Sequence, residues 1–140
     1  MTILFICRGG VFRSRVAQAI ARKENFNDKI ISSGIEADSN LFGDISEHCT
    51  YILAKHNLLE YVQTSWIQTK QELINNADLV VFMSSDVFED AQAKYTISEP
   101  FRVWNIDDVE IHEGKTPQDY NEKLENIFQK IKAQIQDLDL

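Results

Sequence analysis

The sequence contains few cysteines and no long apolar run. Its 140 residues include two cysteines, Cys7 and Cys49, and neither belongs to a CxxC motif. Two cysteines are too few for a disulfide framework, so we expect a reducing, cytoplasmic setting that keeps the thiols free. The first apolar run, TILFI, has five residues and no basic leader, and no later stretch approaches the ~20 apolar residues of a membrane span. We therefore expect no signal peptide and no membrane partner.

Basic residues are also scarce. The chain has 14 Lys and Arg against 22 Asp and Glu, which gives a net charge of −8. This balance disfavours nonspecific binding to nucleic acid or to an anionic membrane, although a local positive pocket remains compatible with it. Of the three histidines, His48 and His56 stand eight residues apart, too far for metal chelation at i,i+4 spacing. The sequence thus predicts no nucleic-acid partner and no metal site.

Short apolar runs alternate with helical patterns along the whole chain. The runs at 2–7, 29–32, 78–83 and 101–106 predict four strands, and those at 2–7 and 78–83 are typical of strands that are buried on both faces. Helical periodicity or capping residues predict helices over 14–24, 46–56, 68–76, 84–94 and from Thr116 toward Leu138, with loops at 35–45 and 107–115. This alternation predicts an α/β three-layer sandwich, with a four-stranded parallel sheet and helices on both faces. Residues 1–140 are expected to form one domain.

The stretch CRGGVFRS, residues 7–14, joins the first predicted strand to the first predicted helix. A loop in this position directs several backbone N–H groups and the positive end of the helix dipole toward one point, which suits an anion. Gly9 and Gly10 permit a tight turn, and Arg13 offers a planar guanidinium for two phosphate oxygens. The same field favours a nucleophilic thiolate at Cys7. Asp107 and Asp108 follow the fourth strand and are expected at the same edge of the sheet.

Read along its length, the sequence resembles the low-molecular-weight protein tyrosine phosphatase family. The family pattern CxxxxxRS after the first strand is matched by Cys7 to Ser14, and the start of its first helix resembles residues 15–18, with Gln18 where glutamate is usual. ISSG at 31–34 is similar to its second-strand motif, DLVVFM at 78–83 to its third strand, and WNIDD at 104–108 to the stretch that ends in its general acid. The resemblance implies the same fold over nearly the whole chain.

The resemblance also implies a function and a set of roles. It implies a phosphatase that needs no metal or cofactor and acts on a phosphorylated protein or a small phosphomonoester through a phosphocysteine intermediate. Cys7 would be the nucleophile, Arg13 the phosphate clamp and Asp108 the general acid, with Asp107 as the fallback. The rest of the loop would bind the phosphate: Arg8, Gly9, Gly10, Val11, Phe12 and Ser14, with Ser14 also stabilising the thiolate.

Several positions depart from the family pattern. Asparagine is usual where Gly10 stands, and the acid is usually followed by proline. Asp38, Val109 and Glu110 occupy the places of the aromatic pocket walls, which predicts weaker binding of aryl phosphates. These departures leave open a catalytically weak or inactive anion-binding regulatory domain of the same fold.

Two related activities, arginine-phosphate hydrolysis and arsenate reduction, would require residues that differ from those of this chain. Related arginine-phosphate phosphatases carry threonine at the position of Val11, so this residue argues against that branch. An arsenate reductase-like protein is a further alternative, but the resolving cysteines of that group are absent near residues 80–90, and Cys49 has the spacing of a core residue. The oligomeric state is not indicated by the sequence.

Overall fold

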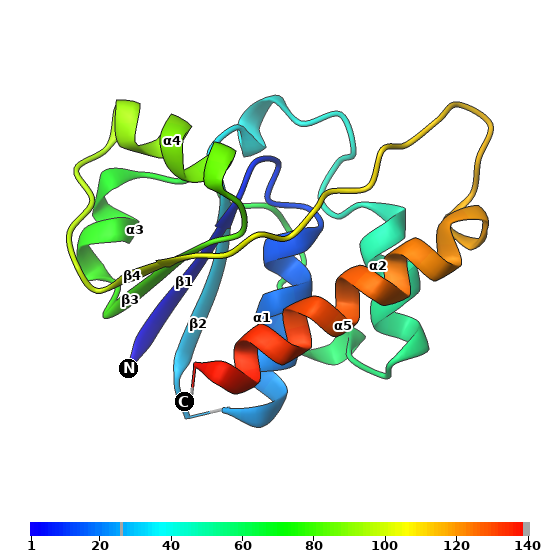
Figure 1. Ribbon diagram of the computed structural model, residues 1–140, viewed down its shortest axis with the longest axis horizontal. Helices are drawn as coiled ribbons and strands as arrows, with labels where there is room; N and C mark the ends of the chain where they lie inside the picture. Colours follow the sequence, from blue (N-terminus) through cyan, green and yellow to red (C-terminus); the bar gives the residue numbers. More distant parts are fainter. Residues whose placement is uncertain (26, 139–140) are drawn as a thin grey trace.

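The computed structural model describes residues 1–25 and 27–138 (Figure 1). In chain order, the regular elements are β1 (Thr2–Cys7), α1 (Arg13–Glu24), β2 (Lys29–Gly34), α2 (Glu47–Lys55), α3 (Gln71–Asn76), β3 (Leu79–Phe82), α4 (Ser85–Lys94), β4 (Phe101–Val103) and α5 (Asn121–Asp137). Three 3-10 turns are inserted between them: η1 (Ala37–Ser39), η2 (Leu59–Tyr61) and η3 (Pro117–Tyr120).

The four strands form one parallel sheet in the order β2-β1-β3-β4. Successive side chains of a strand point to opposite faces, so β1 supplies both halves of the core. Ile3, Phe5 and Cys7 lie in the cluster that contains residues of α1, α2 and α5. Leu4 and Ile6 lie in a second cluster with residues of α3 and α4. Figure 1 shows these helices on the two sides of the sheet, which confirms the predicted three-layer α/β sandwich.

Most predicted elements are confirmed, with shifts at their ends. Ser46 caps α2, because its hydroxyl accepts the N–H of Cys49 at 3.1 Å. Thr116 and Asp119 form a capping box at η3, from which the chain continues into α5. The predicted strand 101–106 is too long: β4 ends at Val103, because its partner β3 ends at Phe82. The helix predicted over 68–76 begins only at Gln71, and the 3-10 turns η1 and η2 were not predicted.

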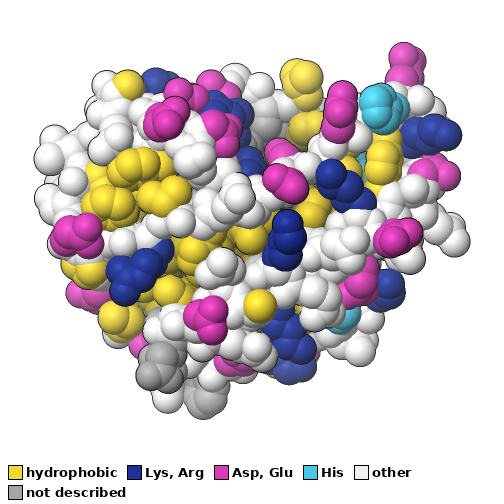
Figure 2. Space-filling model, viewed as in Figure 1, with side chains coloured by type: hydrophobic (Ala, Val, Ile, Leu, Met, Phe, Trp, Pro, Cys, Tyr) yellow, Lys and Arg dark blue, Asp and Glu magenta, His cyan; other side chains and the backbone are white. Residues whose placement is uncertain are grey.

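The parallel strands place all their carboxyl ends at one edge of the sheet. Three segments that leave this edge are the loop from Cys7 to α1, the segment after β2 and the segment after β4. On the face drawn in Figure 2, lysine and arginine side chains lie singly or in small groups among aspartates and glutamates. Within residues 1–25 and 27–138, no helix is both long and apolar enough to span a membrane. The edge formed by the three segments is where polar groups from distant parts of the chain meet.

Candidate active site

The loop after β1 surrounds the sulfur of Cys7. The Gly10 N–H donates to this sulfur at 3.2 Å, and the hydroxyl of Ser14 lies 3.0 Å from it. In the described part of the chain, the N–H groups of Arg8, Gly9, Val11 and Phe12 have no protein acceptor. Unpaired N–H groups at the start of a helix are a binding site for an anion. The loop is therefore shaped for an anion next to a thiol.

Two glycines make this loop geometry possible. Gly10 has a φ of +67°, a left-handed conformation that residues with a Cβ rarely adopt. Gly34, at the end of β2, packs directly against the loop: a Cβ there would lie 2.4 Å from the Gly10 nitrogen and 2.6 Å from the Gly9 carbonyl carbon. The loop thus rests on the bare backbone of β2.

Arg13 stands in the first turn of α1 with its guanidinium buried. It donates to the Ser84 hydroxyl at 3.1 Å and to the Ile106 carbonyl at 2.9 Å. Its other terminal nitrogen lies 3.6 Å from a carboxylate oxygen of Asp108. These contacts hold the planar group between the ends of β3 and β4, so its orientation is set before any ligand arrives.

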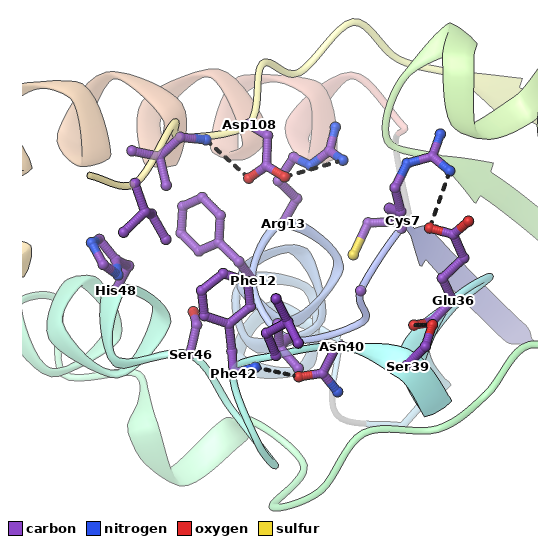
Figure 3. Close-up of a pocket in the computed structure, with 16 residues that line it drawn as sticks. Cys7, Phe12, Arg13, Glu36, Ser39, Asn40, Phe42, Ser46, His48 and Asp108 are labelled. Atoms are coloured by element: carbon purple, nitrogen blue, oxygen red, sulfur yellow. Dashed lines mark hydrogen bonds and ion pairs between the residues drawn. The ribbon is translucent and has the colours of Figure 1, made fainter. Parts of the chain in front are cut away.

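Asp108 and Asp107 occupy different places. Asp108 is more than half exposed and lines the same cavity as Cys7 (Figure 3). Asp107 does not line that cavity; it borders an adjoining hollow that also contains Arg8 and Arg13, and a groove along α5. The structure therefore brings Cys7, Arg13 and Asp108 together and places Asp107 to one side.

The cavity has a volume of about 350 Å³ and is more apolar than the sequence predicts. Of the expected wall residues Asp38, Val109 and Glu110, only Val109 lines it. The rings of Phe12 and Phe42 supply aromatic walls, so the expectation of a pocket without rings was wrong (Figure 3). Sequence reasoning missed further lining residues: Glu36, Ser39, Asn40, Leu41, Ser46, His48 and Ile111.

The missed residues belong mostly to the loop at 35–45 and to the segments that flank it. One signal was available in the sequence, since Leu41 and Phe42 are adjacent large apolar residues that directly follow the polar stretch 38–40. Their exposure, 93% and 50%, is unusual for apolar side chains of this size. The rest of the loop has no periodic pattern that would have indicated which side chains face Cys7.

Arg8 is a loop residue whose side chain turns away from the sulfur. Its guanidinium pairs with Asp90 at 2.8 Å, Asp86 at 3.0 Å and Glu36 at 3.4 Å. Burial alone would lower the pKa of Arg8, but these three carboxylates outweigh it and raise the pKa. The pKa of Asp86 is held below its usual value by hydrogen bonds from Ser84 and Arg8. The Arg8 side chain thus ties the loop to α4, while its backbone N–H has no acceptor among the described residues.

The remaining cysteine and one histidine are buried beside the site. Cys49 is inaccessible to solvent, and burial raises the pKa of its thiol to about 12. This agrees with the prediction of a core cysteine. His48, at the start of α2, is also buried, and neither ring nitrogen has a hydrogen-bond partner in the described residues. Burial lowers the pKa of His48, although the carboxylates of Glu47 and Asp108 act in the opposite direction.

Together, these features define an α/β protein with a cysteine-centred anion loop at the carboxyl edge of a parallel sheet. The family model described as low molecular weight phosphotyrosine protein phosphatase matches residues 2–139. The chain therefore belongs to the low molecular weight phosphotyrosine protein phosphatase family, as the resemblance in its motifs predicts.

Two curated relatives match in sequence. One, from Ralstonia solanacearum, is named Probable low molecular weight protein-tyrosine-phosphatase EpsP and is 32% identical over 94 residues, which cover 67% of this chain and 63% of that protein. The other is a Protein-arginine-phosphatase of Bacillus subtilis, 35% identical over 89 residues, or 60% of this chain and 56% of that protein. The matched stretches thus span less than two thirds of either relative.

Solved structures have the same fold at lower identity. A low molecular weight protein tyrosine phosphatase from Streptococcus pyogenes has a TM-score of 0.74 at 18% identity, over 98% of this chain and 89% of that one. A thioredoxin-dependent arsenate reductase of Corynebacterium glutamicum has a TM-score of 0.65 at 17% identity, over 98% of this chain and 59% of that one. Since the fold is shared by phosphatases and a reductase, the activity must be argued from the site.

Proposed function

We propose that this chain, as a single domain over residues 1–140, is a phosphomonoester hydrolase that acts on phosphotyrosine in proteins through a phosphocysteine intermediate. One observation carries the proposal: the Cys7 sulfur lies within a loop of free N–H groups, in a cavity that also contains the Asp108 carboxyl. A nucleophile, an oxyanion cradle and an acid in one cavity are the requirements of stepwise phosphoryl transfer.

The chemistry follows from these positions. The Cys7 thiolate attacks phosphorus, the bond from phosphorus to the leaving oxygen breaks, and Asp108 gives its proton to that oxygen. Arg13 and the loop N–H groups hold the other phosphate oxygens. A water molecule then attacks the phosphocysteine and gives a proton to Asp108. The S–P bond breaks, which releases inorganic phosphate and returns the thiolate. The free thiol that this cycle needs is kept available by a reducing compartment, and we propose the cytoplasm.

The cavity walls support an aryl phosphate as the substrate. Phe12 and Phe42 offer ring faces, and Val11, Val109 and Ile111 add apolar surface. Such walls bind an aromatic leaving group by burying its ring. The relative from Bacillus subtilis is a protein-arginine phosphatase, so phosphoarginine is the competing substrate. The apolar Val11 in the cavity favours the uncharged tyrosine ring over a guanidinium group.

A reductase activity is not supported by the thiols of this chain. Cys49 is the second of two cysteines, and it is fully buried with a pKa near 12. A thiol in that state is a poor partner for disulfide relay, because the thiolate is the reactive form.

Hydrolysis of p-nitrophenyl phosphate in the presence of EDTA tests the proposal. We expect turnover by the wild type, none by Cys7→Ser, and a loss of about 100-fold in kcat for Asp108→Asn, as is typical when a general acid is removed. Asp107→Asn is the matched control and should change kcat by less than about threefold, since surface carboxylates away from the reacting atoms contribute little.

Three other outcomes would contradict the proposal. Absence of turnover between pH 4 and pH 9 together with vanadate binding would favour the inactive anion-binding domain. Arsenate reduction that depends on thioredoxin would favour the reductase. Faster release of phosphate from a phosphoarginine peptide than from a matched phosphotyrosine peptide would move the chain to the arginine branch.

A further inference from the structure

Arg15 is the largest side chain that is fully buried in the described structure. It stands in the first turn of α1, two residues after Arg13. Its guanidinium donates to three backbone carbonyls: those of Gly10 at 3.2 Å, Asp44 at 2.8 Å and Gln63. Fully buried arginines are rare unless they are paired with an anion. All three acceptors are neutral carbonyls, so these contacts leave the charge uncompensated.

The contact with Gly10 bears directly on the anion loop. In a trans peptide, the carbonyl of one residue and the N–H of the next lie in one plane and point in opposite directions. By donating to the Gly10 carbonyl, Arg15 therefore fixes the direction of the Val11 N–H, one of the unpaired groups of the loop. Gly10 has no Cβ to restrict rotation about its Cα–C bond, so this peptide turns easily in the absence of a brace.

The charge of Arg15 acts on the same site. Burial lowers the pKa of Arg15. Gly10 links the guanidinium to the sulfur, because its carbonyl accepts from Arg15 at 3.2 Å and its N–H donates to Cys7 at 3.2 Å. Arginine stays protonated in proteins even when it is buried. A positive charge one residue away from a sulfur is an arrangement that favours a negative charge on that sulfur.

We propose that Arg15 is a positioning residue of the active site, which holds the anion loop through the Gly10 carbonyl and supplies a buried positive charge that favours the Cys7 thiolate. The inference rests on the proposed function, because it assigns Arg15 a part in the same phosphate site. It adds a residue that does not touch the substrate and acts through the Gly10–Val11 peptide and through the field at the sulfur.

Arg22 provides a matched control on the same helix. It stands two turns after Arg15, is partly buried, and donates to the carbonyls of Ile30 at 3.2 Å and Tyr61 at 3.0 Å. It therefore resembles Arg15 in its type of bonding but does not contact the loop. Arg15→Met and Arg22→Met each remove an arginine that joins α1 to other backbone segments, and only the first change affects the anion site.

Two measurements separate positioning from stability. The first is vanadate affinity, followed by tryptophan fluorescence or calorimetry. The second is the pH profile of iodoacetamide alkylation, which reports Cys7 because Cys49 is buried with a pKa near 12. Other charged groups around Cys7 are the same in all variants and do not affect the comparison: Arg8, Arg13, Glu36, Asp86 and Asp108.

For Arg15→Met, we expect vanadate to bind at least about tenfold more weakly and the alkylation profile to move to higher pH, consistent with the loss of one nearby charge. Arg22→Met should lower the melting temperature and leave both readouts within about twofold of the wild type, as expected for a site with no shared partner.

Unchanged binding and alkylation in folded Arg15→Met, or equal losses in Arg22→Met, would overturn the proposal. If Arg15→Met does not fold, Arg15→Gln keeps a donor amide without the charge, and an unshifted alkylation profile in that variant would overturn it as well.

The two proposals fail in different ways. If the wild type binds vanadate and hydrolyses no phosphomonoester, the proposed function fails. The role of Arg15 would still be supported in that case by weaker vanadate binding in Arg15→Met. If the wild type is an active phosphatase and Arg15→Met matches it in binding and alkylation, the role of Arg15 fails and the proposed function stands.

Discussion

The hydroxyl of Ser14 lies 3.0 Å from the sulfur of Cys7 and accepts a hydrogen bond from the hydroxyl of Ser32 at 2.7 Å. Because Ser32 is the donor in that second contact, the proton of Ser14 can point either at the sulfur or at the carbonyl oxygen of Ser33, which is the longer contact at 3.5 Å. Ser14 is thus set to donate to a thiolate. It would stabilise the sulfur both before attack on phosphorus and when the sulfur leaves the phosphocysteine.

Removal of this donor should slow catalysis with little effect on substrate binding. We expect Ser14→Ala to lower kcat by about 10- to 100-fold, the size of one hydrogen bond to a charged group, with KM within about twofold. Steady-state kinetics with p-nitrophenyl phosphate measure both constants. Ser33→Ala is the matched control, since it removes a buried hydroxyl of β2, next to Ser32, whose partner is the Thr69 hydroxyl at 2.7 Å. An equal loss of kcat in Ser33→Ala would show that the effect of Ser14→Ala is structural.

One methyl group added at Gly34 should strongly weaken anion binding by the loop. An alanine Cβ at this position would lie between 2.4 and 2.7 Å from backbone atoms of Gly10, Gly9 and Arg8. Backbone cannot yield as a flexible side chain does, so the loop must move away from β2. We expect Gly34→Ala to weaken vanadate binding by more than about tenfold, as misplaced oxyanion donors do in other sites.

Gly114→Ala is the control for Gly34→Ala. Gly114 has a φ of +78° and open space around it, so alanine there costs about 1 kcal/mol of backbone strain in a segment outside the loop. The melting temperature of Gly114→Ala should fall, while its vanadate affinity stays within about twofold of the wild type, since distant sites act independently. Strong vanadate binding by Gly34→Ala would contradict the close packing of the loop on β2.

Phe42 should determine the preference for aryl substrates. Its ring is half exposed, lines the cavity and can be covered by the ring of a substrate. We expect Phe42→Ala to raise KM for phosphotyrosine peptides by about 5- to 10-fold, the size of one aromatic contact, and to leave KM for an alkyl phosphate nearly unchanged. Phe42→Leu keeps an apolar side chain and loses the ring. If KM of Phe42→Leu for phosphotyrosine peptides equals that of the wild type, apolar burial alone is sufficient and the ring is not needed.

The sequence predicts the parts of this molecule that depend on local pattern. Continuous apolar runs such as 2–7 indicate strands that are covered on both faces, and the parallel topology then brings Cys7 and Asp108 to one edge. What could not be predicted depends on contacts between distant segments. Phe42 enters the cavity because the loop after β2 folds back over the Cys7 loop, and no periodicity marks that path.

Arg15 illustrates the same limit on a helix. Its neighbours in sequence are those of an ordinary first helical turn, and its burial is decided by the carbonyls of Asp44 and Gln63, which lie 29 and 48 residues away along the chain. The length of β4 is decided in a similar way, by the end of its partner β3. Such features follow from tertiary packing, which overrides local preference.

His48 predicts a dependence of stability on pH. Burial lowers its pKa from an ordinary value near 6.5, and both ring nitrogens are unpartnered within the described residues. As the pH falls below about 6.5, the unfolded chain takes up a proton at His48 while the folded chain does not. This uptake favours the unfolded state. The stability that depends on a neutral His48 is therefore fully present above the pKa of the unfolded chain, and it is lost as the pH falls toward the lower pKa of the folded chain.

Replacement of His48 by leucine should therefore stabilise the fold, most strongly in acid. At pH 7, we expect His48→Leu to raise the free energy of unfolding by about 1 kcal/mol, because two unsatisfied buried nitrogens are removed. The gap between variant and wild type should widen between pH 7 and pH 5. Urea unfolding at a series of pH values measures it, with replacement of the exposed His112 by glutamine as the control. A gap that stays constant or narrows toward pH 5 would mean that His48 is protonated in the folded protein, where the carboxylates of Glu47 and Asp108 would then outweigh burial.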